Sequence, residues 1–159
     1  MTSKFSLKTC ILLNVISLPL TINSATAQAT FDMSDNTQII RKFIQSWSSL
    51  DAEELADYFT EDGIYYNIPS SPVSGRDNVA RFIAGFIRNW ESTEWEIINL
   101  FANGDLVVAE RVDHTVVNGS PVDLPAMGIF EMEDGKIKLW RDYFNLPTYT
   151  EALAAALQQ

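Results

Sequence analysis

Residues 106–113 carry the sequence LVVAERVD, whose strand-forming apolar residues predict a β-strand. Because side chains alternate between the two faces of a strand, every second residue of this stretch shares a face. One face therefore holds Val107, Ala109, Arg111 and Asp113. An ionised carboxylate on an apolar face is unfavourable unless it is paired, hydrogen-bonded or protonated. This strand is therefore a candidate for proton-transfer chemistry.

A second strand with the same property is predicted at residues 137–144, with the sequence IKLWRDYF. Its alternation places Trp140, Asp142 and Phe144 on one face, so a second carboxylate lies between two aromatic side chains. The alternative is a structural aspartate held by hydrogen bonds. Two acids on apolar faces favour a functional interpretation over a structural one.

Three helices are predicted before the main run of strands. Apolar residues recur every three or four positions in each of them. Their expected ranges are 35–47, 51–59 and 79–90. Ser34 or Asp35 can cap the first helix.

The remaining pattern predicts a strand meander. A turn at 61–63 is expected to lead into a strand at 64–68, which a loop at 69–75 follows. Strands are then predicted at 95–102, 106–117, 122–132 and 137–144, and a short helix at 149–157. Turns separate these strands at 103–105, at Asn118-Gly119 and at Asp134-Gly135.

Helices followed by a long antiparallel meander indicate the α+β class. We expect a strongly curved, mixed but mostly antiparallel sheet that forms a cone, with the N-terminal helices packed against it and an internal apolar pocket. The order of elements resembles the cone-shaped fold shared by nuclear transport factors and ketosteroid isomerases. A shared fold does not select among functions.

Residues 1–29 have the pattern of a secretory signal peptide. Lys4 and Lys8 precede a short apolar run, and cleavage sites of the A-x-A type end at Ala27 and at Ala29. An uncleaved anchor is the weaker alternative, because the apolar run is short for a membrane span. We therefore expect an exported protein, periplasmic or secreted, with one domain at 30–159 and no membrane association after cleavage.

Composition restricts the partners further. The chain has 11 basic and 21 acidic residues and a net charge of −10, which argues against nucleic acids and anionic membrane surfaces. Its single cysteine, Cys10, lies in the predicted signal peptide. Its single histidine, His114, lies on the strand face opposite Asp113 and is expected to be structural or exposed. The sequence therefore predicts neither a metal site nor a cofactor.

Five polar side chains can meet inside such a cone: Tyr65, Asn67, Arg111, Asp113 and Asp142. One aspartate, kept protonated, could act as a general acid. The other could deprotonate a water held by the tyrosine and the asparagine, while the arginine balances charge. Acid and base acting together on water and a strained ether would open an epoxide in one step. The alternatives are a surface ion pair on the first strand, a core tyrosine and a turn asparagine.

Five segments resemble limonene-1,2-epoxide hydrolases, and they span almost the whole predicted domain. They are IYYNIP at 64–69, GRD at 75–77, ERVD at 110–113, GKI at 135–137 and WRDYF at 140–144. The resemblance implies that Asp113 is the general acid and Asp142 the base. It implies that Arg111 bridges the carboxylates and that Tyr65 and Asn67 help to hold the water. It also implies a homodimer.

Two features depart from this family. One is the export signal. The other is the segment 121–128, which we expect to line the pocket and to bring Asp123 and Pro125 close to it.

The leading hypothesis is a cofactor-independent epoxide hydrolase that adds water to a small lipophilic epoxide and forms a vicinal diol. One alternative is a ketosteroid-isomerase-like enzyme that moves a proton on a ketone. Another is an exported, non-catalytic binding protein for hydrophobic small molecules, which would need the cavity but not the paired acids.

Overall fold

The computed structural model describes residues 35–68 and 70–158. The predicted signal peptide, its cleavage sites, the capping Ser34 and the domain boundary at residue 30 lie outside the described residues. Within those two ranges, the structure contains no helix that is both long and apolar enough to span a membrane.

The N-terminal helices form because their apolar residues fall on one side. Helix α1 (Asp35–Ser46) continues into the 3₁₀ turn η1 (Trp47–Ser49), and the buried side chains Ile40, Phe43 and Trp47 face the sheet. The short helix α2 (Ala52–Ala56) follows, and the Asp51 carboxylate caps it by accepting from two backbone N–H groups. The prediction that this helix reaches residue 59 was wrong, because strand β1 begins there.

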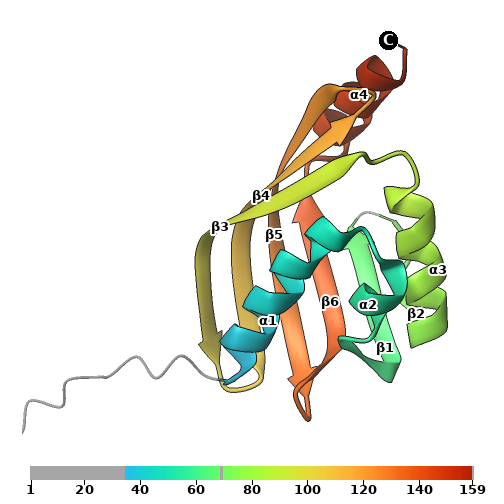
Figure 1. Ribbon diagram of the computed structural model, residues 1–159. Coiled ribbons are helices and arrows are strands. Elements are labelled where there is room, and N and C mark those ends of the chain that lie inside the picture. The colour runs from blue at the N-terminus through green and yellow to red at the C-terminus, as the bar shows by residue number, and fades with distance from the viewer. Residues whose placement is uncertain (1–34, 69, 159) are drawn as a thin grey trace, which may run out of the picture. The chain divides into compact units, whose positions relative to one another are not determined.

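A six-stranded sheet with the order β2-β1-β6-β5-β4-β3 forms the other layer (Figure 1). The strands are β1 (Phe59–Ile68), β2 (Val73–Ser74), β3 (Ser92–Asn103), β4 (Leu106–Val117), β5 (Ser120–Glu133) and β6 (Lys136–Phe144). The pair β1 and β6 is parallel, whereas every other pair is antiparallel. The predicted α+β class is therefore confirmed, and the curved sheet is open, with β2 and β3 at its edges.

The predicted hairpin turns are confirmed in position and geometry. Asn118-Gly119 and Asp134-Gly135 have positive φ at both central residues, with values of 49° and 71° in the first turn and 50° and 73° in the second. Such angles define the tight turns whose twist matches that of the flanking strands. These turns fix the register of the meander from β4 to β6.

The turn expected at 61–63 was wrong, because β1 runs through it. The pairing of β1 with β6 shifts register between Phe59 and Ile64, so the strand bulges there. A Cβ atom added to Gly63 would lie 2.9 Å from the Cβ of Phe59 and 3.1 Å from the carbonyl oxygen of Ile137. Glycine therefore permits the close approach at the bulge.

Two more helices complete the fold. Helix α3 (Arg76–Ile87) packs beside β1 and β2, and α4 (Leu146–Leu157) packs against one end of β4 and β5 (Figure 1). Between α1 and the sheet, Trp140 lies at the centre of an aromatic cluster. Its ring stacks on Tyr65 at 4.2 Å and meets the edge of Phe43 at 5.2 Å. This cluster supports one wall of the site described next.

Candidate active site

A narrow pocket opens between the inner face of the sheet and the helices α3 and α4. Four of the five predicted site residues line it: Tyr65, Asn67, Asp113 and Asp142. Its other lining residues are Phe86, Trp90, Trp95, Thr115, Val122, Leu124, Phe144 and Tyr149. The fifth predicted residue, Arg111, is 1% exposed and lies behind the two carboxylates.

The Arg111 guanidinium bridges both aspartates, each through two hydrogen bonds. Nε and Nη2 donate to Asp113 at 2.8 and 3.1 Å, and Nη1 and Nη2 donate to Asp142 at 2.8 and 2.7 Å. The three side chains are 0%, 7% and 5% exposed. The alternative of an ion pair on a solvated face is therefore wrong.

Small residues on β5 make this bridge possible. The strands β4 and β6 are not neighbours, because β5 runs between them and separates them by about 10 Å. On the face shared with Arg111 and Asp142, β5 contributes Ala126 and Gly128 at the pairing positions. At these two positions β5 therefore carries no long side chain of its own between Arg111 and Asp142.

Trp95 holds the guanidinium from a third strand. The Arg111 Cζ atom lies 4.4 Å from the centre of its ring, and Trp47 stacks on the other side at 4.1 Å. The indole N–H of Trp95 donates to the Thr93 hydroxyl at 3.0 Å, and this bond fixes the plane of the Trp95 ring. The position of Trp95 opposite Asp113 on the neighbouring strand is known only once β3 and β4 are paired.

The electrostatics of the cluster favour one bound proton. Burial, together with the charge of Asp142, raises the pKa of Asp113 to about 7 against the opposing effect of Arg111. For Arg111, burial acts to lower the pKa, but the two carboxylates outweigh it and the pKa rises. With one proton on Asp113, the buried group of two acids and one guanidinium is neutral.

A guanidinium only donates hydrogen bonds, so an acidic proton on Asp113 cannot point towards Arg111. Asp113 also lines the pocket, so in this state it can donate a hydrogen bond to a molecule there.

Tyr65 and Asn67 lie beside the second carboxylate because β1 and β6 run parallel in register. Tyr65 pairs with Trp140, and Asn67 pairs with Asp142. Both side chains are buried, and burial raises the pKa of the Tyr65 phenol. The amide oxygen of Asn67 has no hydrogen-bond partner among the described residues, so it can accept from a molecule in the pocket.

Aromatic side chains close the pocket. Phe86 contacts Trp90 at 5.0 Å and Tyr149 at 5.5 Å, and Phe144 contacts Tyr149 at 6.4 Å, as measured between ring centres. The remaining cavity has a volume of about 10 Å³, which is room for about one water molecule. A larger ligand therefore requires these rings to move apart.

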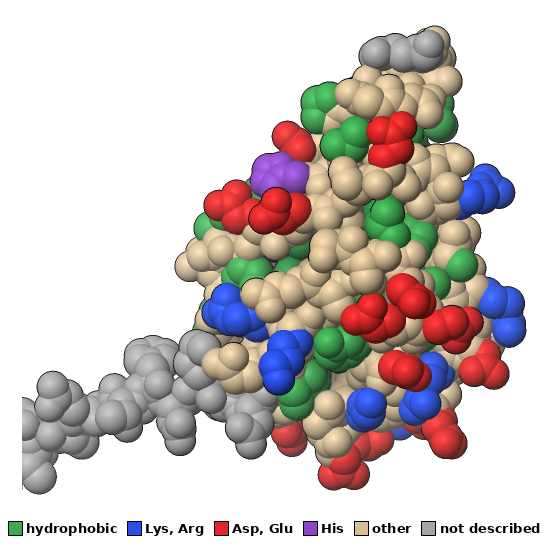
Figure 2. All heavy atoms as spheres, viewed as in Figure 1, with side chains coloured by type: hydrophobic (Ala, Val, Ile, Leu, Met, Phe, Trp, Pro, Cys, Tyr) green, Lys and Arg blue, Asp and Glu red, His purple; other side chains and the backbone are tan. Residues whose placement is uncertain are grey.

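The expectation for the segment 121–128 was partly wrong. Val122 and Leu124 line the pocket, but the alternation of β5 turns Asp123 and Pro125 to the opposite, exposed face. There Asp123 lies 3.0 Å from His114, and the hydrogen bond between them raises the pKa of the imidazole. The histidine is exposed as expected, among the acidic side chains on the surface (Figure 2).

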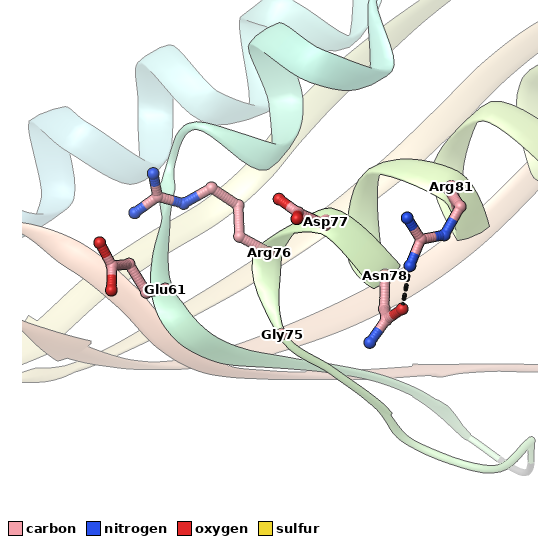
Figure 3. A pocket seen from close by; sticks show the side chains of 6 residues that line it. All are labelled: Glu61, Gly75, Arg76, Asp77, Asn78 and Arg81. Atoms are coloured by element: carbon pink, nitrogen blue, oxygen red, sulfur yellow. Dashed lines mark hydrogen bonds between the residues drawn. The ribbon is translucent and has the colours of Figure 1, made fainter.

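Another hollow, of about 470 Å³, lies at the start of α3 (Figure 3). Its side chains include Glu61, Arg76, Asp77 and Arg81, and Arg81 is hydrogen-bonded to Asn78. Charged groups of both signs line it, so it lacks the apolar walls that a lipophilic ligand needs. The chemistry therefore centres on the narrow pocket. Across the described residues, no group of three or more His, Cys, Asp or Glu side chains is arranged to hold a metal ion.

Sequence reasoning missed several residues of the pocket. Thr115 shares a strand face with Asp113 two residues away, which is a signal that the alternation offers. Tyr149 lies in the predicted C-terminal helix, whose packing against the sheet leaves no local signal. Trp90 and Trp95 also face the cavity.

Comparisons with known proteins show which family the chain is similar to. Residues 40–140 match the family model described as a SnoaL-like domain. The chain is 28% identical, over 110 residues, to the epoxide hydrolase EphG of Mycobacterium tuberculosis; the match covers 67% of this chain and 71% of EphG.

Solved structures extend the likeness. The structure of an M. tuberculosis LEH-like epoxide hydrolase matches with a TM-score of 0.66 and 25% identity, over 78% of this chain and 92% of the other. A protein from Shewanella putrefaciens, described as a SnoaL-like polyketide cyclase, matches with a TM-score of 0.69 and 17% identity, over 78% and 99% of the two chains. The second match supports the fold.

Proposed function

The chain belongs to the SnoaL-like domain family, and within that family we propose that it is a cofactor-independent epoxide hydrolase. Its substrate is a small lipophilic epoxide, and its product is a vicinal diol. The observation that carries this proposal is the buried bridge in which Arg111 binds Asp113 and Asp142 in an apolar pocket. The likeness to EphG supports it.

Catalysis then needs one concerted step. Asp142 takes a proton from a water molecule, whose oxygen attacks a carbon of the epoxide ring. As that carbon–oxygen bond breaks, Asp113 transfers its proton to the epoxide oxygen. One proton is taken and one is given, so the reaction consumes only water, and a proton returns from Asp142 to Asp113 before the next turnover.

The roles of the two acids follow from their surroundings. Asp113 has a pKa raised to about 7, which suits a group that must carry a proton near neutral pH. Asp142 lies beside Asn67, whose free amide oxygen can orient the attacking water together with Tyr65. Arg111 keeps both carboxyl groups in place while the proton moves between the two sides of the substrate.

Labelled water tests the proposal directly. Limonene oxide, cyclohexene oxide and styrene oxide are incubated with the protein in H₂¹⁸O, and we expect diols that contain one labelled oxygen. Asp113→Asn and Asp142→Asn should each lower kcat/KM by about 10²- to 10⁴-fold.

The control is Asp123→Asn, which removes an exposed carboxylate outside the pocket and should leave turnover intact. Turnover that survives both pocket substitutions would exclude the catalytic assignment. Equilibrium binding of the epoxides without turnover would favour the non-catalytic binding protein.

An isomerase of the ketosteroid type would use one carboxylate as a base and a hydroxyl donor for the enolate. That chemistry gives no task to the guanidinium that bridges both acids. We therefore place epoxide opening ahead of it. Proton exchange at the α-carbon of a cyclic ketone, followed by NMR, would reveal the isomerase.

Export and assembly complete the proposal. We propose that the signal peptide is removed during export to the periplasm or the medium, by cleavage after Ala27 or Ala29, and that the mature protein is a homodimer. N-terminal sequencing of the secreted protein should give a first residue of Gln28 or Thr30. Light scattering during size-exclusion chromatography measures the assembly.

A further inference from the structure

Two hydroxyl groups in the pocket have no task in the hydrolysis just described. Thr115 is 3% exposed and Tyr149 is 7% exposed, and both line the cavity that holds the two carboxyl groups. An apolar substrate would be met equally well by valine and phenylalanine at these positions. Their hydroxyls therefore indicate that the substrate is not purely apolar.

The Tyr149 hydroxyl has a proton to donate. The Trp90 side chain acts on the Tyr149 phenol, and because an indole N–H can only donate, a hydrogen bond between the two groups leaves the phenolic proton for another acceptor. No bond in which Tyr149 donates is formed among the described side chains. The proton remains for an acceptor in the pocket, at its aromatic end beside Phe86 and Phe144.

The Thr115 hydroxyl offers an acceptor instead. The Thr93 oxygen receives the indole N–H of Trp95 at 3.0 Å, and its own proton goes to the backbone carbonyl of His114 at 3.1 Å. The 3.0 Å contact between the two threonine hydroxyls forms together with these two bonds when Thr115 is the donor. Its oxygen lone pairs are left for a donor in the pocket.

A hydroxyl group on the substrate can accept from Tyr149 or donate to Thr115, so it can pair with either side chain. We infer that the substrate is an epoxide that carries a hydroxyl group, which Thr115 and Tyr149 recognise, and not an unfunctionalised hydrocarbon epoxide. This inference rests on the proposed function. With an apolar substrate, the Tyr149 proton and the Thr115 lone pairs would face the ligand without a hydrogen-bond partner.

The spacing sets where the hydroxyl lies on the substrate. Thr115 follows Asp113 by two residues on the same face of β4, which is about 7 Å and the reach of four to five single bonds. The epoxide oxygen lies at Asp113 in the proposed reaction. An alcohol four to five bonds from the ring therefore fits, as in a hydroxymethyl group across a six-membered ring.

The test compares two substrates that differ by that group: cyclohexene oxide and its 4-(hydroxymethyl) derivative. We expect kcat/KM to be at least about tenfold higher for the alcohol, mainly through KM. Tyr149→Phe and Thr115→Val should each bring the ratio of the two kcat/KM values towards one. Thr115→Ser, which keeps the hydroxyl, should restore the preference.

Tyr143→Phe is the matched control, because it removes the same group from an exposed tyrosine on the other face of the sheet. It should keep the ratio of the parent protein. A ratio near one in the parent, or a ratio that neither pocket substitution changes, would overturn the inference.

Binding separates this inference from the proposed function. Cyclohexylmethanol and methylcyclohexane cannot react, and their Kd values follow from quenching of tryptophan fluorescence. Preference for the alcohol that Tyr149→Phe removes, in a protein that hydrolyses neither epoxide, would refute hydrolysis but support recognition of the hydroxyl. Hydrolysis of both epoxides with equal Kd values for the two probes would support hydrolysis but refute recognition of the hydroxyl.

Discussion

At the level of single residues, Arg111 is the side chain on which the site depends. It is one cation between two buried carboxyl groups, and each of its three nitrogens donates to a carboxyl oxygen. A buried ion pair contributes little net stability compared with apolar residues, but removal of one partner leaves the other charge uncompensated. The geometry of the site and the stability of the fold are therefore coupled at this residue.

Arg111→Gln should destabilise the protein by about 3 to 5 kcal/mol at neutral pH, because two carboxyl groups then face each other without a cation. Urea unfolding followed by tryptophan fluorescence measures the change. Arg141→Gln is the control, since Arg141 is partly exposed and pairs with Glu131 at the surface, where such a pair contributes less than about 1 kcal/mol. Equal losses in the two variants would contradict a special role for Arg111.

The raised pKa of Asp113 makes stability depend on pH with a definite sign. The folded protein keeps this proton up to about pH 7, whereas the unfolded chain releases it near the ordinary value of 3.8. Between these two values the folded state binds more protons, so this group makes the free energy of unfolding fall as pH rises. Urea titrations from pH 4 to 8 should show that slope in the parent and a smaller one in Asp113→Asn.

The same group gives activity an alkaline limit. A general acid must carry its proton, so kcat/KM should decline as pH rises through about 7. The pH profile of epoxide hydrolysis, recorded at constant ionic strength, measures it. A profile that stays flat from pH 6 to 9 would contradict the role of Asp113 as the acid.

At the level of elements, β5 determines whether the strands on either side of it can share a site. Gly128 lies between Ala109 and Asp142 in the ladder, and an added Cβ would lie 2.8 Å from the Phe130 ring and 2.9 Å from the Trp140 indole nitrogen. Both rings belong to the packed aromatic cluster. Neither ring can therefore move aside in the way that the end of a flexible side chain can.

Gly128→Ala should therefore destabilise the protein by about 1 to 3 kcal/mol and lower kcat/KM, because Trp140 is pushed towards the neighbouring Tyr65. Thermal unfolding and the epoxide assay measure the two effects. Gly85→Ala is the control: this glycine lies inside α3 with open space around it, so alanine should stabilise the helix by about 0.5 to 1 kcal/mol. Effects of the same sign at both glycines would contradict the packing argument.

Helix α4 is the second element that shapes the pocket, because it carries Tyr149. The Asn145 side chain caps it by accepting from the Thr148 N–H at 3.1 Å. Asn145→Ala should weaken the helix by about 1 kcal/mol and speed hydrogen exchange in its first turn. Asp51→Ala, which removes the cap of α2, should leave exchange in α4 unchanged.

At the scale of the whole molecule, the alternation of side chains within strands was the sequence pattern that predicted the structure reliably. It placed Arg111 with Asp113 on one face and His114 on the other, and the positive-φ turns then set the order of the meander. Pairings between distant segments have no local signal. The parallel partnership of β1 with β6, and the residues that α4 brings to the pocket, depend on packing over long separations.

The boundaries that failed have physical causes as well. Phe59 fits a helical period, but its buried ring packs 6.0 Å from Phe43 as part of the strand. The acidic residues and glycine at 61–63 have turn composition, yet a bulge accommodates them inside β1. In both cases a tertiary contact outweighed local preference.

The strand order also has a consequence for how the chain acquires its shape. The last strand in sequence, β6, lies between β1 and β5, near the middle of the sheet. Until those C-terminal residues are available, β1 has only the two-residue β2 beside it, and Asp113 lacks its opposite acid. Sequence separation this large slows folding. A nascent chain therefore cannot complete the sheet, or bring its two acids together, before β6 has been synthesised.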